Sequence, residues 1–348
     1  MKVSIGTNIK DGPWGGGNLF AINLKNYLQK QGHKVCTDLK DNDIDIILIT
    51  EPRLTSESSA FTDTEVLNYL KKINKEAIVV HRINECDERK NTDYVNKALI
   101  KANRVADHTV FVSSWLKKLF IDQGLKNSNL NVILGGADDE IFNKSNKRNF
   151  KDGNKIKIVT HHWGNNWNKG FEIYSKLDAL LGSEPWSNKF VFSYIGNLPK
   201  DFNFENTEYI KPLSGHELAS KLKENDFYLT ASLNEPSGNH HIEAAQCGLP
   251  ILFINSGGIP EYCQNFGIEF NESNFFDKFN EMADNFKDYQ SQMDKYPFNA
   301  NKMCLDYLNL FEKLLKNKEN LIKTRELPRL SYKDMLLVYI KEFYKKVR

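Results

Sequence analysis

Residues 226–254 read DFYLTASLNEPSGNHHIEAAQCGLPILFI, which is an apolar run, a polar loop, a helical segment and a second apolar run. The two apolar runs, residues 227–231 and 250–254, have the length and composition of buried strands. The segment between them, residues 240–247, is typical of a helix. Because parallel strands need a crossover connection, this order predicts two parallel strands joined by a helix.

The same alternation of strand and helix extends in both directions from this stretch. Before residue 145 it predicts a helix near residues 18–31 and strands at residues 3–5, 44–50, 77–83, 108–113 and 131–135. After residue 154 it predicts further strands at residues 155–160 and 190–195. Residues 146–154 are polar and carry no apolar period, as an interdomain linker does. We therefore expect one α/β domain over residues 1–145 and a second over residues 155–328.

The remaining segment, residues 329–348, has apolar residues at helical spacing. We expect a C-terminal helix that crosses back and packs on the first domain. It carries six basic and two acidic residues, so contact with anionic lipid at the inner face of the membrane is an open alternative.

Composition excludes several classes of protein. The chain of 348 residues has 40% hydrophobic and 26% charged residues, and no apolar run approaches the roughly 20 residues of a membrane span. Its N-terminus lacks the pattern of a signal peptide, so we expect a cytoplasmic protein. The net charge is only +2, and no nucleic-acid recognition motif appears, which argues against nucleic acid as a partner. The five cysteines are widely spaced, so we expect reduced thiols rather than a zinc or redox site.

A glycine run, Gly15-Gly16-Gly17, follows the first predicted strand and opens an amphipathic helix. Glycines let backbone amides approach a phosphate at the positive end of a helix. The run lacks the pattern of dinucleotide-binding proteins, and such runs are also found in plain tight turns. Gly16 and Gly17 are therefore candidates for phosphate contact.

Two glutamates in the opening stretch, Glu235 and Glu243, are separated by seven residues. Glu235 follows the end of a predicted strand, and Glu243 lies about one turn inside the next helix. Both therefore point toward one crevice at the carboxyl edge of a parallel sheet, where carboxylates suit sugar hydroxyls. The loop between them presents helix N-terminal amides to a diphosphate.

Residues 226–263, including both glutamates, Cys247-Gly248-Leu249-Pro250 and Gly257-Gly258-Ile259-Pro260-Glu261, resemble the donor half of the family 4 retaining glycosyltransferases. Other fragments agree in the right order: Gly15-Gly16-Gly17, Gln31-Gly32-His33-Lys34-Val35, Ala106-Asp107, Gly136-Ala137-Asp138 and Asn168-Lys169-Gly170. The resemblance covers nearly the whole chain. It implies the GT-B fold, in which two Rossmann-like, doubly wound domains face each other across a cleft. The first domain then lies on the acceptor side, and the second binds the nucleotide-sugar donor.

The resemblance also implies a role for each matching position. Glu243 binds the nucleotide ribose, Glu235 faces the transferred sugar, and Lys169 neutralises the diphosphate. Backbone amides of Ser237, Gly238 and Asn239 lie near the sugar and phosphate. No metal and no other cofactor are then required, although Asp43-Ile44-Asp45 has the spacing of a metal-binding motif.

One position departs from the family pattern. The family has an arginine five or six positions before the lysine, whereas this chain has Trp163 and Gly164 there. His161 and His162 lie just ahead of this position. Either an imidazole replaces the arginine, in its charged form or by N–H donation, or Arg82 or another residue reaches over from the first domain. The neighbouring His81 ends a predicted strand, where the family often has a histidine near the reacting sugar.

These features predict a glycosyltransferase that moves a hexose from a nucleotide sugar of the UDP or GDP type to a hydroxyl acceptor, a glycan or a lipid. The resemblance implies retention of configuration and a place in cell-envelope or glycan biosynthesis. Two alternatives stay open at this point. One is a nucleotide-sugar epimerase of the same fold, and the other is a non-catalytic protein that binds nucleotide sugars.

Overall fold

A computed structural model describes residues 1–10, 12, 15–329, 336 and 339 of the chain. The chain divides into two compact units. Unit 1 comprises Met1–Asp87, Thr92–Ile133 and the described residues from Met303 onward, and unit 2 comprises Glu88–Asn91 and Leu134–Lys302. The sequence pattern placed the linker at residues 146–154, which here lie inside unit 2.

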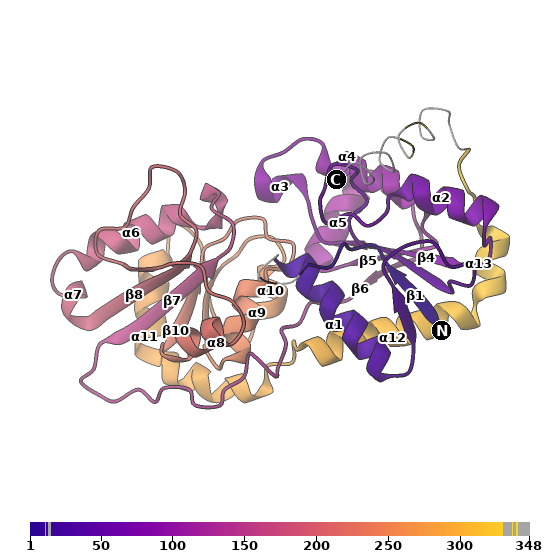
Figure 1. Cartoon of the computed structure of the whole chain (residues 1–348). Coiled ribbons are helices and arrows are strands. Elements are labelled where there is room, and N and C mark those ends of the chain that lie inside the picture. The colour runs from indigo at the N-terminus through magenta and orange to yellow at the C-terminus, as the bar shows by residue number, and fades with distance from the viewer. Residues whose placement is uncertain (11, 13–14, 330–335, 337–338, 340–348) are drawn as a thin grey trace. The chain divides into compact units, whose positions relative to one another are not determined.

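Unit 1 contains a sheet of six parallel strands within the described residues, in the order β2-β1-β3-β4-β5-β6 (Figure 1). The strands are short and mostly apolar, as expected for strands covered on both faces. Their bounds are β1 (Lys2–Ile5), β2 (Lys34–Cys36), β3 (Ile46–Ile49), β4 (Ile78–Ile83), β5 (His108–Phe111) and β6 (Leu130–Val132).

Two apolar cores cover opposite faces of this sheet. On one face, Val80 of β4 packs with side chains of α1 (Gly16–Lys30) and α12 (Ala300–Lys316), and on the other, Val79 packs with side chains of α2 (Asp63–Lys72). This alternation follows from the two-residue period of a strand. The helices of unit 1 are α1 (Gly16–Lys30), α2 (Asp63–Lys72), α4 (Val95–Ala102), α5 (Ser114–Asp122) and α13 (Lys318–Thr324), with the 3-10 turn η1 (Asn103–Val105). The short helix α3 (Asp87–Lys90) lies, apart from Asp87, in a segment that belongs to unit 2.

Unit 2 repeats the architecture, with a described sheet of six parallel strands in the order β12-β11-β10-β7-β8-β9. The strands are β7 (Ile156–His162), β8 (Phe190–Gly196), β9 (Glu208–Ile210), β10 (Phe227–Thr230), β11 (Ile251–Ile254) and β12 (Gly267–Phe270). The helices are α6 (Phe171–Leu181), α7 (Trp186–Lys189), α8 (Gly215–Lys223), α9 (Asn239–Gln246), α10 (Ile259–Cys263) and α11 (Phe275–Gln292), with the 3-10 turns η2 (Trp167–Lys169) and η3 (Met293–Lys295). One continuous apolar core joins the sheet to its flanking helices.

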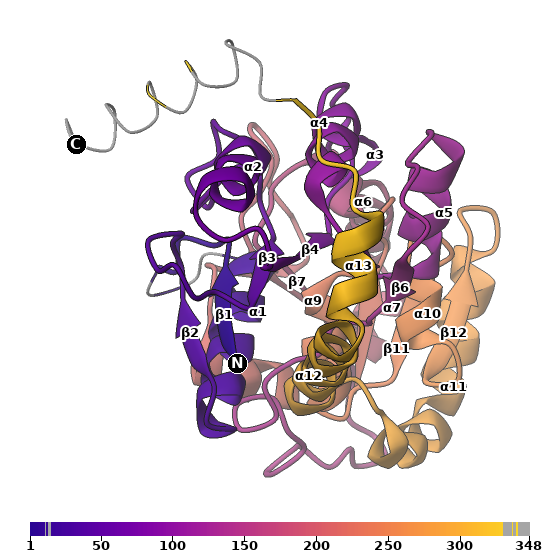
Figure 2. The same cartoon turned by 90° about the vertical axis from the view of Figure 1, so that its right-hand side faces the viewer.

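Helix α12 (Ala300–Lys316) begins in unit 2 and continues into unit 1. Its residues from Met303 onward pack with α1 and the β1, β3 and β4 strands, and α13 follows directly (Figures 1 and 2). At the end of α13, Arg325 forms a two-bond ion pair with buried Asp107, at 2.7 and 2.6 Å. Arg325 also donates to the carbonyls of Lys75 and Ala77 at 2.8 and 2.7 Å. The chain therefore returns to the unit in which it started.

The two parallel sheets with flanking helices confirm the predicted α/β class. Three strands were missed, namely β2, β9 and β12, and each lies at the edge of its sheet. The predicted helix over residues 329–348 lies almost entirely outside the described residues. Within the described part of the chain, no helix is both long and apolar enough to cross a membrane.

Candidate donor site

The site residues predicted in the second half of the chain gather at the carboxyl edge of the unit 2 sheet. β7 and β10 are parallel neighbours, so they end on the same side, at His162 and Thr230. The loop after β10 leads directly into α9. In open α/β sheets, ligands bind outside the carboxyl ends of the strands.

Lys169 and Glu235 form a buried ion pair at this edge. Lys169 Nζ donates a hydrogen bond to Glu235 Oε1, and Ser232 Oγ donates to the same oxygen at 2.9 Å. The two charged residues are only 6% and 4% exposed. Burial raises the pKa of the Glu235 carboxyl, but the neighbouring positive charge, Lys169 foremost, outweighs burial and lowers that pKa to about 2. Glu235 is therefore ionised at neutral pH.

Gly170 lets the turn that carries Lys169 approach the loop after β10. Its φ is +101°, in the left-handed region, and a Cβ atom there would lie 2.7 Å from Ala231 Cβ. Next to this contact, the amide of Leu233 donates to the carbonyl of Asn168 at 2.7 Å. Only glycine fits this close approach, which brings the ammonium within reach of the carboxylate.

Glu243 lies on α9 and is bonded to His161 near the end of β7. His161 Nε2 and Glu243 Oε2 are 2.9 Å apart, and both residues are buried. The backbone N–H of His161 donates to the hydroxyl of Tyr228 at 3.0 Å, so the neighbouring strand β10 holds the histidine in place. Each of the two glutamates therefore has its own nitrogen partner.

Three more buried imidazoles surround these pairs. His162 Nε2 is bonded to the hydroxyl of Tyr174 at 2.8 Å, and its ring is 4.6 Å from that of His240. Burial lowers the pKa of His162 and of His240 well below 6.5, and lowers that of His241 to about 3. These rings are neutral at neutral pH. His162 therefore carries no positive charge that could replace the arginine of the family pattern.

The imidazoles do not form a metal centre. Among the described residues, no group of three or more His, Cys, Asp or Glu side chains is placed to hold a metal ion.

The loop between the glutamates approaches α9 closely. Gly238 has a φ of +82°, and a Cβ atom there would lie 2.6 Å from the ring of His241. Helix α9 begins at Asn239, and no side chain caps its first turn. The amide groups at this helix start therefore lack a side-chain acceptor, which favours an anion there. Ser237 lies beside Gly135, because a Cβ on that glycine would be 3.2 Å from Ser237 Oγ.

In unit 1, Gly16 and Gly17 form the first turn of α1, as the sequence predicts. No side chain caps this turn and no acidic residue lies in it. Arg82 of β4 packs on the same helix, with its guanidinium carbon 3.9 Å from the centre of the Phe20 ring. The structure therefore brings Arg82 to the helix that the glycine run opens.

His81 faces the opposite side of β4 from Arg82. It is fully buried, and its Nδ1 lies 3.0 Å from Oδ1 of Asn103, which also accepts a hydrogen bond from Thr109. Burial lowers the pKa of His81 to about 4. Its Nε2 has no hydrogen-bond partner within the described chain.

The predicted site residues thus fall into one set per unit. Unit 2 brings together Lys169, Glu235, Glu243, His162 and the loop residues Ser237, Gly238 and Asn239. Unit 1 holds Gly16, Gly17, Arg82 and His81. The sequence pattern did not assign the partners of these groups, namely His161, Ser232, Tyr174 and Asn103. Of these, only His161 carried a signal, because it lies beside His162 in the strand that precedes Lys169.

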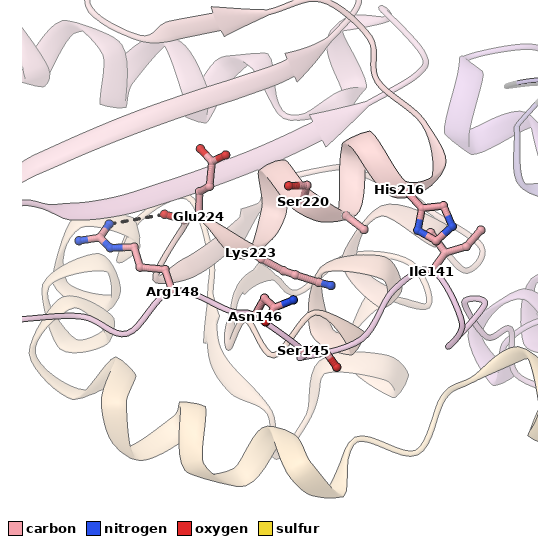
Figure 3. A pocket seen from close by; sticks show the side chains of 9 residues that line it. Ile141, Ser145, Asn146, Arg148, His216, Ser220, Lys223 and Glu224 are labelled. Atoms are coloured by element: carbon pink, nitrogen blue, oxygen red, sulfur yellow. Dashed lines mark hydrogen bonds between the residues drawn. The ribbon is translucent and has the colours of Figure 1, made fainter.

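A surface pocket in unit 2 lies apart from these residues. It has a volume of about 260 Å³ and lies between α8 and the segment around residues 141–148 (Figure 3). Within it Arg148 donates to the carbonyl of Glu224 at 3.5 Å. Its lining contains none of the predicted site residues. The candidate site is therefore identified by buried charge and not by an open cavity.

Comparison with known proteins gives a partial sequence match and extensive structural matches. Residues 200–294 match the family model of the glycosyl transferases group 1. No curated protein sequence matches the chain.

Among solved structures, the chain is similar to a glycosyltransferase from Rickettsia africae, with a TM-score of 0.65 and 15% identity over 91% of this chain and 99% of that one. It is also similar to Anabaena HepE in complex with UDP-glucose, with a TM-score of 0.61 and 12% identity over 90% and 100% of the two chains. Sucrose-phosphate synthase from Thermosynechococcus elongatus matches with a TM-score of 0.63 and 13% identity over 90% and 99%.

These likenesses establish the GT-B fold over most of the chain. The family match begins before α8 and ends just after α11, so it includes Glu235, Glu243 and the loop between them. The chain therefore has the GT-B fold, and residues 200–294 within it match the family model of the glycosyl transferases group 1.

Proposed function

We propose that this protein is a glycosyltransferase that moves a hexose from a nucleotide sugar to a hydroxyl acceptor, with retention of configuration and without a metal ion. The observation that carries the proposal is the pair of buried carboxylates, Glu235 and Glu243, at one sheet edge inside the matched region. Each has a nitrogen partner, so each carboxylate has a defined place.

In the proposed reaction, Glu243 accepts hydrogen bonds from the ribose, and Glu235 accepts them from the hexose. A carboxylate with a pKa of about 2 keeps its charge at neutral pH, so Glu235 acts only as an acceptor. It therefore suits hydroxyl recognition and does not suit the delivery of a proton.

The proposed leaving group is the nucleoside diphosphate. The bond between the anomeric carbon and the phosphate oxygen breaks, and the acceptor oxygen bonds to that carbon. The acceptor proton passes to the departing phosphate. Lys169 and the uncapped amides of α9 stabilise the negative charge that develops. These groups do the work that a divalent cation does in other enzymes, which is why we propose a metal-independent reaction.

The nucleotide is proposed to be UDP or GDP, and the UDP bound in Anabaena HepE supports the first of the two. The acceptor is proposed to be a glycan or lipid hydroxyl. A cytoplasmic location, with peripheral contact at the inner face of the membrane, suits such an acceptor.

A panel of nucleotide sugars tests the proposal in two steps. Thermal shift identifies the donor, since a ligand that binds the folded state raises the apparent stability. Release of nucleoside diphosphate is then measured with and without an acceptor mixture, in the presence of excess EDTA. We expect acceptor-dependent release that survives EDTA. Isomerisation of the donor without an acceptor indicates an epimerase, and binding without any turnover indicates a non-catalytic protein. Either result contradicts the proposal.

A further inference from the structure

His161 is the one side chain hydrogen-bonded to the Glu243 carboxylate within the described residues, and it joins two elements that are distant in sequence. It belongs to β7 and Glu243 belongs to α9, 82 positions later. From the sequence, His161 is a candidate only beside His162, as an imidazole that could replace the family's arginine. Its function must be inferred from its contacts.

Tyr228 of the neighbouring strand holds both the backbone and the ring of His161. The His161 N–H donates to the hydroxyl of Tyr228 at 3.0 Å, and that hydroxyl lies 3.3 Å from the His161 carbonyl oxygen. The Tyr228 ring also contacts the imidazole edge to face, with centroids 5.6 Å apart. Tyr228 itself is fully buried, so His161 is held by a rigid neighbour.

The bond between His161 and Glu243 constrains the carboxylate. A carboxylate only accepts hydrogen bonds, so the proton lies on His161 Nε2. Both residues are 7% exposed, and a charge-assisted bond in such surroundings is stronger than one in water. It fixes Oε2 and leaves Oε1 without a partner among the described side chains and backbone groups. One carboxylate oxygen is thus held and the other is available to a ligand.

The imidazole is also not fully satisfied. Its Nδ1 is buried and has no hydrogen-bond partner within the described chain. A buried polar atom without a partner is costly, by about 1–3 kcal/mol, unless a ligand or water bonds to it. The pair therefore offers one unfilled acceptor, Glu243 Oε1, to a ligand that carries hydroxyl groups.

We propose that His161 is a positioning residue that orients Glu243 toward the ribose hydroxyls and so makes the site selective for ribonucleotides over 2′-deoxyribonucleotides. This inference rests on the proposed function, in which Glu243 binds the ribose. A flexible carboxylate accepts hydrogen bonds from water and ligand alike. A carboxylate held in one orientation binds a ligand more tightly when the ligand's hydroxyls match that orientation. The entropy cost of ordering the carboxylate has then been met before the ligand binds.

The test is a comparison of affinities for UDP against 2′-deoxy-UDP, and for GDP against 2′-deoxy-GDP, by titration calorimetry. A hydrogen bond to a charged group contributes about 1.5–3 kcal/mol, so we expect the wild type to prefer the ribonucleotide by about tenfold or more. His161→Met removes the N–H donor while keeping a similar volume. We expect it to reduce this ratio to about threefold or less.

Two further variants separate the loss of the N–H hydrogen-bond donor from a general loss of folding. The amide of Gln reaches the position of Nε2, whereas the shorter Asn side chain does not, so His161→Gln should keep most of the preference and His161→Asn should lose it. These two variants carry the test if His161→Met does not fold. His108→Met alters a buried histidine of unit 1 and serves as the matched control, for which we expect the wild-type ratio.

An unchanged ratio in a His161→Met or His161→Asn variant that still binds the ribonucleotide overturns the positioning role. It leaves the proposed function intact. If the wild type binds neither UDP nor GDP nor any nucleotide sugar, then the proposed function itself fails. The two failures are therefore distinguishable.

Discussion

At the scale of single residues, Lys169 is the positive charge on which the proposed leaving-group site depends. Replacing it with Met removes the charge from a diphosphate and also leaves Glu235 buried without its ammonium partner. We expect nucleoside diphosphate binding to weaken by about 10- to 150-fold, the loss of one charge-assisted contact of about 1.5–3 kcal/mol. Titration calorimetry with UDP and GDP measures this effect.

Lys176→Met is the control for this prediction. Lys176 forms an exposed pair with Glu172 on α6, and such pairs contribute little. Wild-type affinity in the Lys169 variant would place the binding cation elsewhere, and Arg82 would be the next residue to replace.

The buried histidines predict an unusual sensitivity to mild acid. His81 has a pKa of about 4 and His241 of about 3, and burial lowers those of His162 and His240 well below 6.5. Below pH 6.5 the unfolded chain therefore binds more protons than the folded one. Stability that is present above pH 6.5 is lost as the pH falls, by up to about 1.4 kcal/mol per histidine per pH unit.

Urea unfolding between about pH 7 and about pH 5 measures this loss before most carboxylates take up protons. We expect the free energy of unfolding to fall steadily over this range. A constant value over the same range would mean that these imidazoles are not buried in the neutral form.

The shared location of Glu235 and Glu243 beside one loop was predicted from their spacing, and the roles proposed for them came from the family resemblance. Their partners could not be predicted in the same way. His161 is 82 positions from Glu243 and Lys169 is 66 positions from Glu235, so only the folded sheet brings them together. The neutral state of His162 was also hidden, since burial depends on Tyr174 and on the helices packed around it.

At the scale of elements, Gly170 holds η2 against the loop after β10. Replacing it with Ala places a Cβ atom 2.7 Å from Ala231 Cβ, in addition to the strain of a φ of +101°. Gly153→Ala is a matched control, because Gly153 has a φ of +87° and open space around its Cβ position. The strain common to both variants is about 1–2 kcal/mol.

We expect Gly170→Ala to be less stable than Gly153→Ala by about 1–3 kcal/mol, the usual cost of overpacking. We also expect it to bind diphosphate more weakly, since it displaces the turn that carries Lys169. Chemical denaturation and calorimetry check the two effects. Equal stability of the two variants would show that the close approach costs nothing.

The central strands were predictable, whereas of the edge strands of the two described sheets only β6 was predicted. β3 is a fully buried run of apolar residues, and β4 is fully buried and apolar apart from His81 and Arg82, which is a strong signal. By contrast, β2 and β9 have three residues each and no buried position, and β12 alternates between buried and exposed positions. Backbone pairing with the neighbouring strand makes these segments strands, and that pairing leaves little trace in side-chain composition.

At the scale of the whole molecule, the ion pair of Arg325 with Asp107 binds the end of the returning chain to unit 1. The two side chains are 6% and 3% exposed, and Asp107 also accepts a hydrogen bond from the amide of Val79. Breaking a buried pair by removing one partner costs about 3–5 kcal/mol. We expect Arg325→Met to destabilise unit 1 by about this amount.

Lys318→Met is the control, because Lys318 pairs with Glu76 at the surface and such a pair contributes about 1 kcal/mol or less. Hydrogen exchange read by mass spectrometry reports the two units separately. We expect faster exchange in α12, α13 and β4 of the Arg325 variant. Exchange that is unchanged in these elements would show that the apolar contacts of α12 hold the chain without the ion pair.

The most direct test of the donor site is a calorimetric titration with the nucleoside diphosphate, followed by single-turnover rates, for Glu235→Gln and Glu243→Gln. We expect Glu243→Gln to bind the diphosphate more weakly, because that ligand carries the ribose. We expect Glu235→Gln to bind it at least as well as the wild type, because Lys169 loses a competing anion, and to turn over more slowly. Normal binding and normal turnover in both variants would contradict a donor site at this edge of the sheet.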